Sequence, residues 1–300
     1  MAILVLVSVL AFSLNGTSIR LFQTRARDAV RRLPLYQSVF CLIAALLFAA
    51  KGGFALPSLM TLLYGIAFGV FFCLATAMSA KGFAMGSMAL TSLIINMSLI
   101  IPMLYSILFE REPVELLHVI GFLLFFASLC LSAHTAGDAA EADKKRSRRA
   151  GWLWLCVILL GFFSNGFTAT LQKNYALHSP VNQDEMFLAV AYVVACLLFA
   201  ARFLANRGKP AEGAPADRSV DLLLLIGLAL TAGLGSFGGN LLLGILSTEI
   251  PGAILYPCIN GGLALCTSLI SFTLFREKPT AQKLASLVVG CGAIVVLNLA

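Results

Sequence analysis

The sequence predicts an all-α membrane protein with ten transmembrane helices, and three observations support this fold class. Apolar stretches follow one another along almost the whole chain, hydrophobic residues make up 60% of it, and charged residues only 12%. Soluble domains contain about 45–50% apolar and about 25% charged residues, so this composition excludes a soluble core. In a chain of 300 residues only short loops remain, and any site must lie among the helices.

Each apolar stretch is interpreted as one helix. Most have close to the roughly 20 residues that a helix needs to cross a hydrocarbon core. Lipid offers the backbone no hydrogen-bond partner, and the stretches lack the alternating polarity of barrel strands. The first has no basic segment before it and is too long for a signal peptide, so we expect it to be retained. In order, the stretches cover residues 3–22, 33–50, 56–80, 83–109, 114–133, 151–171, 186–204, 222–247, 253–275 and 284–300.

Basic residues gather in alternate loops. Of the 21 Lys and Arg, all except Lys51, Arg111 and Lys173 lie in or beside the loops that follow the odd-numbered helices. Loops rich in Lys and Arg stay in the cytoplasm. We therefore predict a protein of the cell membrane with a cytoplasmic basic linker at 135–150 and both termini outside. Basic loops beside the membrane also account for the net charge of +7 without a nucleic-acid partner.

The two halves of the chain carry matching features. The dipeptide Asn-Gly occurs at residues 15–16 and again at 165–166, at an offset of 150. The loop at 25–32 is basic, whereas its counterpart at 184–185 is acidic. Because five helices are an odd number, the second repeat of five starts on the opposite side of the membrane from the first. Equivalent loops of the two repeats then lie on opposite sides and should differ in charge. We predict two inverted five-helix repeats, which gives the segments 1–134, 135–150 and 151–300.

Short turns follow the fourth and ninth stretches. Residues 109–113 read Phe-Glu-Arg-Glu-Pro, residues 275–279 read Phe-Arg-Glu-Lys-Pro, and glycine-containing stretches follow both. With its ten helices, the chain resembles the drug/metabolite transporter (DMT) superfamily, and the EamA-like branch in particular. The resemblance implies two EamA-like repeats and transport by alternating access. Members of that family usually have both termini in the cytoplasm, whereas the charges here favour the reverse.

No charged residue lies near the centre of a predicted helix. Glu110, Glu112 and Glu115 follow the fourth stretch, and we expect them to be solvated at the membrane edge. Small multidrug resistance proteins of the same superfamily carry a Glu in the first helix for proton exchange, where this chain has Asn15. Because an amide does not titrate, we expect no proton coupling through the first helix. Neutral, zwitterionic or amphiphilic solutes fit this chain better than cations.

Amides and hydroxyls are the candidate solute-binding groups. Asn15 and Ser18 share a face of the first helix, and Asn165 and Thr168 share a face of the sixth, with Gln172 one turn further. Because the two pairs are equivalent in the repeat, we expect them to face each other and line a cavity. The alternative is that these groups only bond neighbouring helices and serve packing.

The ninth stretch adds Tyr256, Pro257 and Asn260. Proline removes a backbone donor, so we expect a kinked helix with freed carbonyls, as at transporter binding sites. Tyr256 and Asn260 are four residues apart and share a face. Asn96 in the fourth stretch and Asn240 in the glycine-rich eighth are further candidates. A structural kink and close glycine packing are the alternatives.

We therefore expect a secondary transporter, acting as an exporter of small polar or amphiphilic metabolites such as amino acids. A translocator of lipid-linked or nucleotide sugars is the alternative within the superfamily. An integral membrane enzyme is the alternative outside it, although no catalytic set of residues is found in the sequence. The expected partners are the solute and the lipid bilayer, with a homodimer left open. We expect no cofactor and no metal, since the eight cysteines lack metal-ligand spacing.

Overall fold

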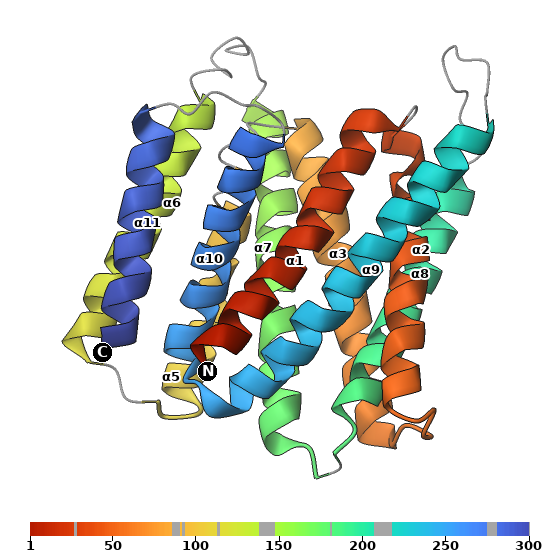
Figure 1. Ribbon diagram of the computed structural model, residues 1–300, viewed down its shortest axis with the longest axis horizontal. Helices are drawn as coiled ribbons and strands as arrows, with labels where there is room; N and C mark the ends of the chain where they lie inside the picture. The colour runs from red at the N-terminus through yellow and green to blue at the C-terminus, as the bar shows by residue number, and fades with distance from the viewer. Residues whose placement is uncertain are drawn as a thin grey trace. The chain divides into compact units, whose positions relative to one another are not determined.

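The computed structural model is helical throughout, over the residues that it describes (Figure 1). These are residues 1–26, 29–85, 91, 94–112, 115–137, 148–180, 182–206, 218–274 and 281–299, and none of them lies in a strand. The middle of the predicted linker and the predicted turn at 275–279 fall outside them. The helices are α1 Ala2–Arg25, α2 Ala29–Lys51, α3 Leu59–Met85, the 3-10 helix η1 Met97–Leu99, α5 Ile100–Leu108, α6 Leu116–Gly137, α7 Arg148–His178, α8 Asp184–Asn206, α9 Arg218–Glu249, α10 Gly252–Thr273 and α11 Ala281–Leu299.

The all-α prediction is confirmed, and the helices have the length and composition of membrane spans. In the described chain, six helices are long and apolar enough to cross a membrane: Ala2–Arg25, Arg31–Lys51, Leu59–Gly82, Trp152–His178, Asp184–Ala205 and Leu222–Glu249. Shorter apolar helices are Ile94–Leu108, Leu116–Ser128, Gly252–Thr267 and Leu284–Leu297. These properties fit a membrane protein.

Two helices differ from their predicted form. The sixth stretch was predicted to end at residue 171, but α7 continues to His178. Hydropathy measures only apolar length, and the last turns of α7 contain polar residues, Lys173 and Asn174, whose side chains find partners inside the protein. The fourth stretch was predicted as one helix over 83–109. Among its described residues, the 3-10 turn η1 instead precedes the short helix α5.

The chain divides into two compact units. The first unit contains Met1–Cys73 and His178–Ile245, and the second contains Leu74–Leu177 and Leu246–Ala300. Each unit therefore combines helices from both halves of the sequence. The long helix α3 contributes its first part to the first unit and its last turns to the second.

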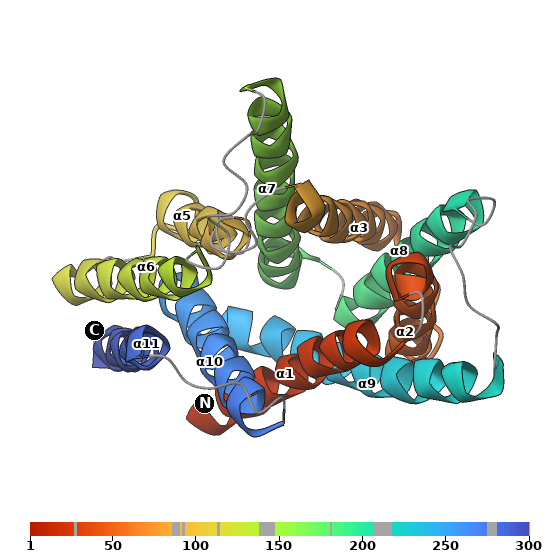
Figure 2. The ribbon, with the colours of Figure 1, turned by 90° about the horizontal axis from the view of Figure 1, so that it is seen from above.

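In the first unit, α2 and α8 lie side by side (Figures 1 and 2). Aromatic rings fill the space around this pair. The ring of Tyr192 on α8 lies 5.8 Å from that of Phe48 on α2 and 5.9 Å from that of Phe72 on α3. Phe48 also contacts Phe237 of α9, with ring centroids 4.8 Å apart. Buried rings of this size account for much of the apolar packing.

In the second unit, α6 and α11 form the corresponding pair (Figure 2). Ser128 on α6 donates a hydrogen bond to the carbonyl of Ser286 on α11 at 2.7 Å. A buried apolar cluster joins this pair to α5 and α10 through Met103, Ala253 and Leu297. Both pairs, α2 with α8 and α6 with α11, join helices that the five-helix repeat makes equivalent. The repeat itself stays a prediction.

Candidate functional site

A polar network joins α1 to α9 in the first unit. Asn15 Nδ2 donates to Ser236 Oγ and, at 3.3 Å, to the carbonyl oxygen of Ala232. One turn along α1, Ser18 Oγ lies 2.6 Å from Thr231 Oγ1. Ser18 is buried and Asn15 is half-buried. The two residues that the sequence placed on one face of the first helix therefore both point toward α9.

Asn240 extends this network to α8. Its Nδ2 donates to Tyr192 Oη at 2.9 Å and to the carbonyl oxygen of Ser236 at 3.0 Å. Both Asn240 and Tyr192 are buried. We call these groups, on α1, α8 and α9, the first-unit network. Sequence reasoning missed Tyr192 and Ser236 as members, although the four-residue spacing of Ser236 and Asn240 on α9 was a usable signal.

In the second unit, polar groups follow one face of α7. Asn165 Nδ2 donates to Ser98 Oγ of η1 at 2.7 Å. Thr168 is buried and donates to the carbonyl of Asn165 in its own helix at 2.6 Å. Ser164, next to Asn165, is 1% exposed, and its Oγ has no hydrogen-bond partner among the described residues. Sequence reasoning did not single out Ser98 or Ser164.

The candidates on α10 have different surroundings. Tyr256 is buried, and its Oη donates to the carbonyl of Ala169 on α7 at 3.2 Å. Asn260 instead donates to the carbonyl of Tyr256 in its own helix at 3.1 Å. The α-helix continues through Pro257, and the expected kink there stays a prediction. Among its described residues, the fourth stretch contains the 3-10 turn η1. A proline removes only one backbone donor, and the turns on either side keep theirs.

Gln172 and Asn96 complete the predicted set. Gln172 is buried on α7, one turn beyond Thr168. Asn96 precedes η1 and is exposed. Asn15, Ser18 and Asn240 thus lie in the first unit, and the other six predicted residues lie in the second.

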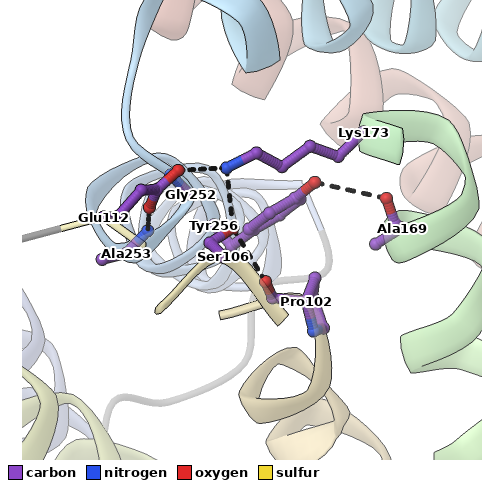
Figure 3. A network of polar contacts seen from close by, with 8 residues as sticks. All are labelled: Pro102, Ser106, Glu112, Ala169, Lys173, Gly252, Ala253 and Tyr256. Atoms are coloured by element: carbon purple, nitrogen blue, oxygen red, sulfur yellow. Dashed lines mark hydrogen bonds and ion pairs between the residues drawn. The ribbon is translucent and has the colours of Figure 1, made fainter. Parts of the chain in front are cut away.

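The most unusual group in the second unit is a buried lysine (Figure 3). The side chain of Lys173 on α7 is 1% exposed, and that of Glu112, its ion-pair partner, is 14% exposed. Lys173 Nζ also donates to Ser106 Oγ of α5 at 2.6 Å. Ser106 in turn donates to the carbonyl of Pro102 at 3.0 Å. The ammonium group is therefore held by one carboxylate and one hydroxyl.

Glu112 is also the cap of α10. Its Oε1 accepts a hydrogen bond from Gly252 N at 3.0 Å, and its Oε2 accepts one from Ala253 N at 3.3 Å. The first amides of a helix have no partner within the helix, and the helix dipole favours negative charge there. A Cβ on Gly252 would lie 2.7 Å from Lys173 Nζ. The absence of a side chain at Gly252 is what allows this close approach.

This ion pair corrects two expectations. Glu112 was expected to be solvated, but most of its side chain is buried against Lys173 and α10. Lys173 was placed in a loop, but it lies inside α7, because α7 is longer than its apolar stretch. The partners lie 61 residues apart in sequence, and no local pattern connects them. The neighbouring bond from Asn174 Nδ2 on α7 to Tyr105 Oη on α5 was missed for the same reason.

Within the described part of the chain, no three His, Cys, Asp or Glu side chains are placed to hold a metal ion. No family model matches the sequence, and no curated protein matches it. A solved structure described only as "Crystal structure of protein" is similar in fold, with a TM-score of 0.65 and 14% sequence identity. The match covers 96% of this chain and 98% of that one. At this identity the likeness concerns the fold alone.

Proposed function

We propose that this protein is a secondary transporter of small polar or amphiphilic metabolites, such as amino acids, in the cell membrane. The observation that carries the proposal is the distribution of polarity. Large apolar side chains such as Leu197, Leu223 and Val288 are 63%, 75% and 71% exposed, whereas amides and hydroxyls are buried between the helices. Exposed apolar side chains fit contact with lipid, and polar groups buried among apolar ones between the helices fit a solute path.

The pairing of equivalent helices supports an inverted repeat. A two-fold axis that relates two five-helix halves brings some equivalent helices together, and α2 with α8 and α6 with α11 are such pairs. Inverted repeats of this kind are typical of alternating-access transporters. In this proposal the protein is an EamA-like member of the DMT superfamily, acting as an exporter.

Solute binding is assigned to the polar residues that already exchange hydrogen bonds between helices. In the first unit these are Asn15 and Asn240, and in the second Asn165 and Tyr256. Amide and hydroxyl groups can donate and accept, which suits neutral and zwitterionic solutes. Ser164 adds a buried hydroxyl beside Asn165.

Liposomes that contain the purified protein and are loaded with labelled neutral amino acids are expected to release these solutes faster than protein-free liposomes. The expectation rests on the buried polar groups described above. Efflux measured by filtration, with chemical analysis of the released solute, checks it. Chemical conversion of the solute without flux would contradict transport and favour a membrane enzyme.

The variants Asn15→Ala and Asn165→Ala separate binding from packing in the same assay. If the two amides line the solute path, each variant keeps its folded yield and loses most of its flux. If they only join helices, each variant melts at a lower temperature and retains the affinity for the solute.

Orientation is a separate prediction of the charge pattern. Because almost all basic residues lie on one side of the predicted spans, we expect both termini outside and residue 147 inside. A single Cys near residue 147 should resist an impermeant thiol reagent in intact cells, and one added after Ala300 should react, once the native cysteines are shown to be silent. The reverse labelling would restore the usual orientation of the family.

A further inference from the structure

The ion pair of Lys173 and Glu112 is costly for a purely structural contact. Burying two charges takes more free energy than their attraction returns unless further hydrogen bonds satisfy them, and apolar side chains of similar volume can hold the same segments at least as well. Here Ser106 and two α10 amides supply those further bonds. The contact is therefore complete only while three segments stay together.

Those segments are the end of α5 with its following turn, α7 and the start of α10. Lys173 on α7 binds Ser106 on α5 and Glu112 in the turn, and Glu112 binds the first amides of α10. Losing the ion pair frees the turn from α7, while Glu112 can still accept hydrogen bonds from the first amides of α10. When Lys173 also releases Ser106, the bond between Asn174 and Tyr105 still joins α5 to α7 at this end.

Both ends of α5 have irregular backbone. At its start, the 3-10 turn η1, Met97–Leu99, interrupts the helical stretch. After its end, Arg111 has φ = 55°, a left-handed conformation that is strained for a residue with a side chain. Such positions absorb backbone rotation when a short element moves. α5 is therefore a nine-residue helix between two points of irregular backbone, and Lys173 binds it near one end.

We propose that Lys173 and Glu112 form a latch whose opening is a step of the transport cycle. Closed, the latch holds the end of α5 and the start of α10 on α7. Open, α5 moves about η1 and Arg111. The proposal rests on the transport function above, because the latch joins α5 to α7, the helix that carries Asn165 and Thr168.

The opened groups have a route to water. Glu112 is already partly exposed, so its carboxylate turns outward without crossing the unit. Lys173 lies in the second-last turn of α7, and its long apolar chain lets the ammonium reach the helix end while the stem stays buried. The repeat-equivalent position in α1 is Gln23, which is exposed and carries no charge. A Lys–Glu latch at this position is therefore specific to the second repeat.

Hydrogen exchange in detergent tests the latch without any transport assay. The amides of Gly252 and Ala253 are protected by Glu112, so their exchange reports opening. Peptides that cover 100–112 and 250–256 are expected to exchange faster than peptides from α8. Lys173→Met should accelerate exchange in 100–112 about tenfold or more, or about 1.4 kcal/mol in the opening equilibrium. Lys51→Met, which breaks the exposed pair with Glu185, is the control and should leave exchange in both peptides unchanged. If all segments exchange at equal rates and Lys173→Met accelerates them together, the latch proposal is overturned and the ion pair only stabilises the fold.

A reversible lock then tests its role in flux. A Cβ on Gly252 would lie 3.1 Å from Ser106 Cβ, close to the roughly 3.5–4.5 Å that a disulfide spans. The variant Ser106→Cys with Gly252→Cys, oxidised and checked by mass, should lose amino-acid flux and regain it on reduction, while the flux of Ser106→Cys alone, which keeps Gly252, should respond to neither treatment. Equal flux in the oxidised and reduced forms would overturn the proposal. If the unmodified protein moves no solute, the transport function fails, and hydrogen exchange still decides whether the latch opens.

Discussion

Replacing Glu112 by alanine is expected to destabilise the folded protein by roughly 3–5 kcal/mol, the range for removing one partner of a buried ion pair. Lys173 is then buried with Ser106 as its remaining hydrogen-bond acceptor, and α10 loses its cap. Lys173→Met should be milder, because Glu112 keeps the two α10 amides and some contact with water. Thermal unfolding of the purified variants in detergent measures both changes.

The double variant, Glu112→Ala with Lys173→Met, provides the sharper comparison. It removes both charges, so its loss of stability should be smaller than the sum of the two single losses. The matched control is Lys51→Met, in a pair whose side chains are 44% and 24% exposed, where about 0–1 kcal/mol is expected. If the stability losses of the two single variants are additive, or if Lys51→Met destabilises the protein as much as Glu112→Ala, burial does not determine how much the ion pair contributes to stability.

Gly235→Ala is expected to force α1 away from α9. The new Cβ would lie 2.5 Å from the carbonyl oxygen of Ala11 and 2.9 Å from the backbone nitrogen of Asn15. Backbone atoms cannot rotate aside, so the helices must separate, at about 1–3 kcal/mol for overpacking. The bond between Asn15 and the adjacent Ser236 should weaken at the same time. A lower melting temperature together with reduced amino-acid flux is the expected result.

Gly227→Ala supplies the comparison within the same helix. Nothing lies within 4 Å of a Cβ at Gly227, and alanine favours helix over glycine by up to about 1 kcal/mol. This variant should melt at the same temperature as the unmodified protein or slightly above it. If the two glycine variants have the same melting temperature, the close contact between α1 and α9 does not require glycine at position 235.

The helices could be predicted because hydrophobic length is a local property of the sequence. The same measure failed at the end of α7, where Lys173 continues the helix in a polar stretch. Whether a polar residue there is solvated or buried depends on a partner that is distant in sequence and becomes a neighbour only in the folded protein. Glu112 lies in the turn after α5, 61 residues from Lys173 in sequence. From its sequence neighbours alone, it was therefore interpreted as a solvated residue at the membrane edge.

The candidate site shows the same division. The spacing of Asn15 and Ser18 correctly placed both on one face, since helical periodicity fixes which residues of a helix are neighbours. Their partners Ser236 and Thr231 depend on how α9 is set beside α1. Tyr256 and Asn260 share a face of α10 as predicted, yet Asn260 bonds within its own helix. Helical periodicity does not distinguish a side chain that bonds a neighbouring helix from one that bonds its own helix.

The composition of the two units has a consequence for synthesis. α2 packs on α8, and α1 packs on α9, so the first unit lacks α8 and α9 until the ribosome has passed residue 245. The second unit waits for α11, the last helix made. Long-range pairings of this kind form slowly and leave early helices without their final neighbours. In the membrane location that we propose, α1 to α3 must therefore stay in lipid without their final neighbours, which their apolar composition allows.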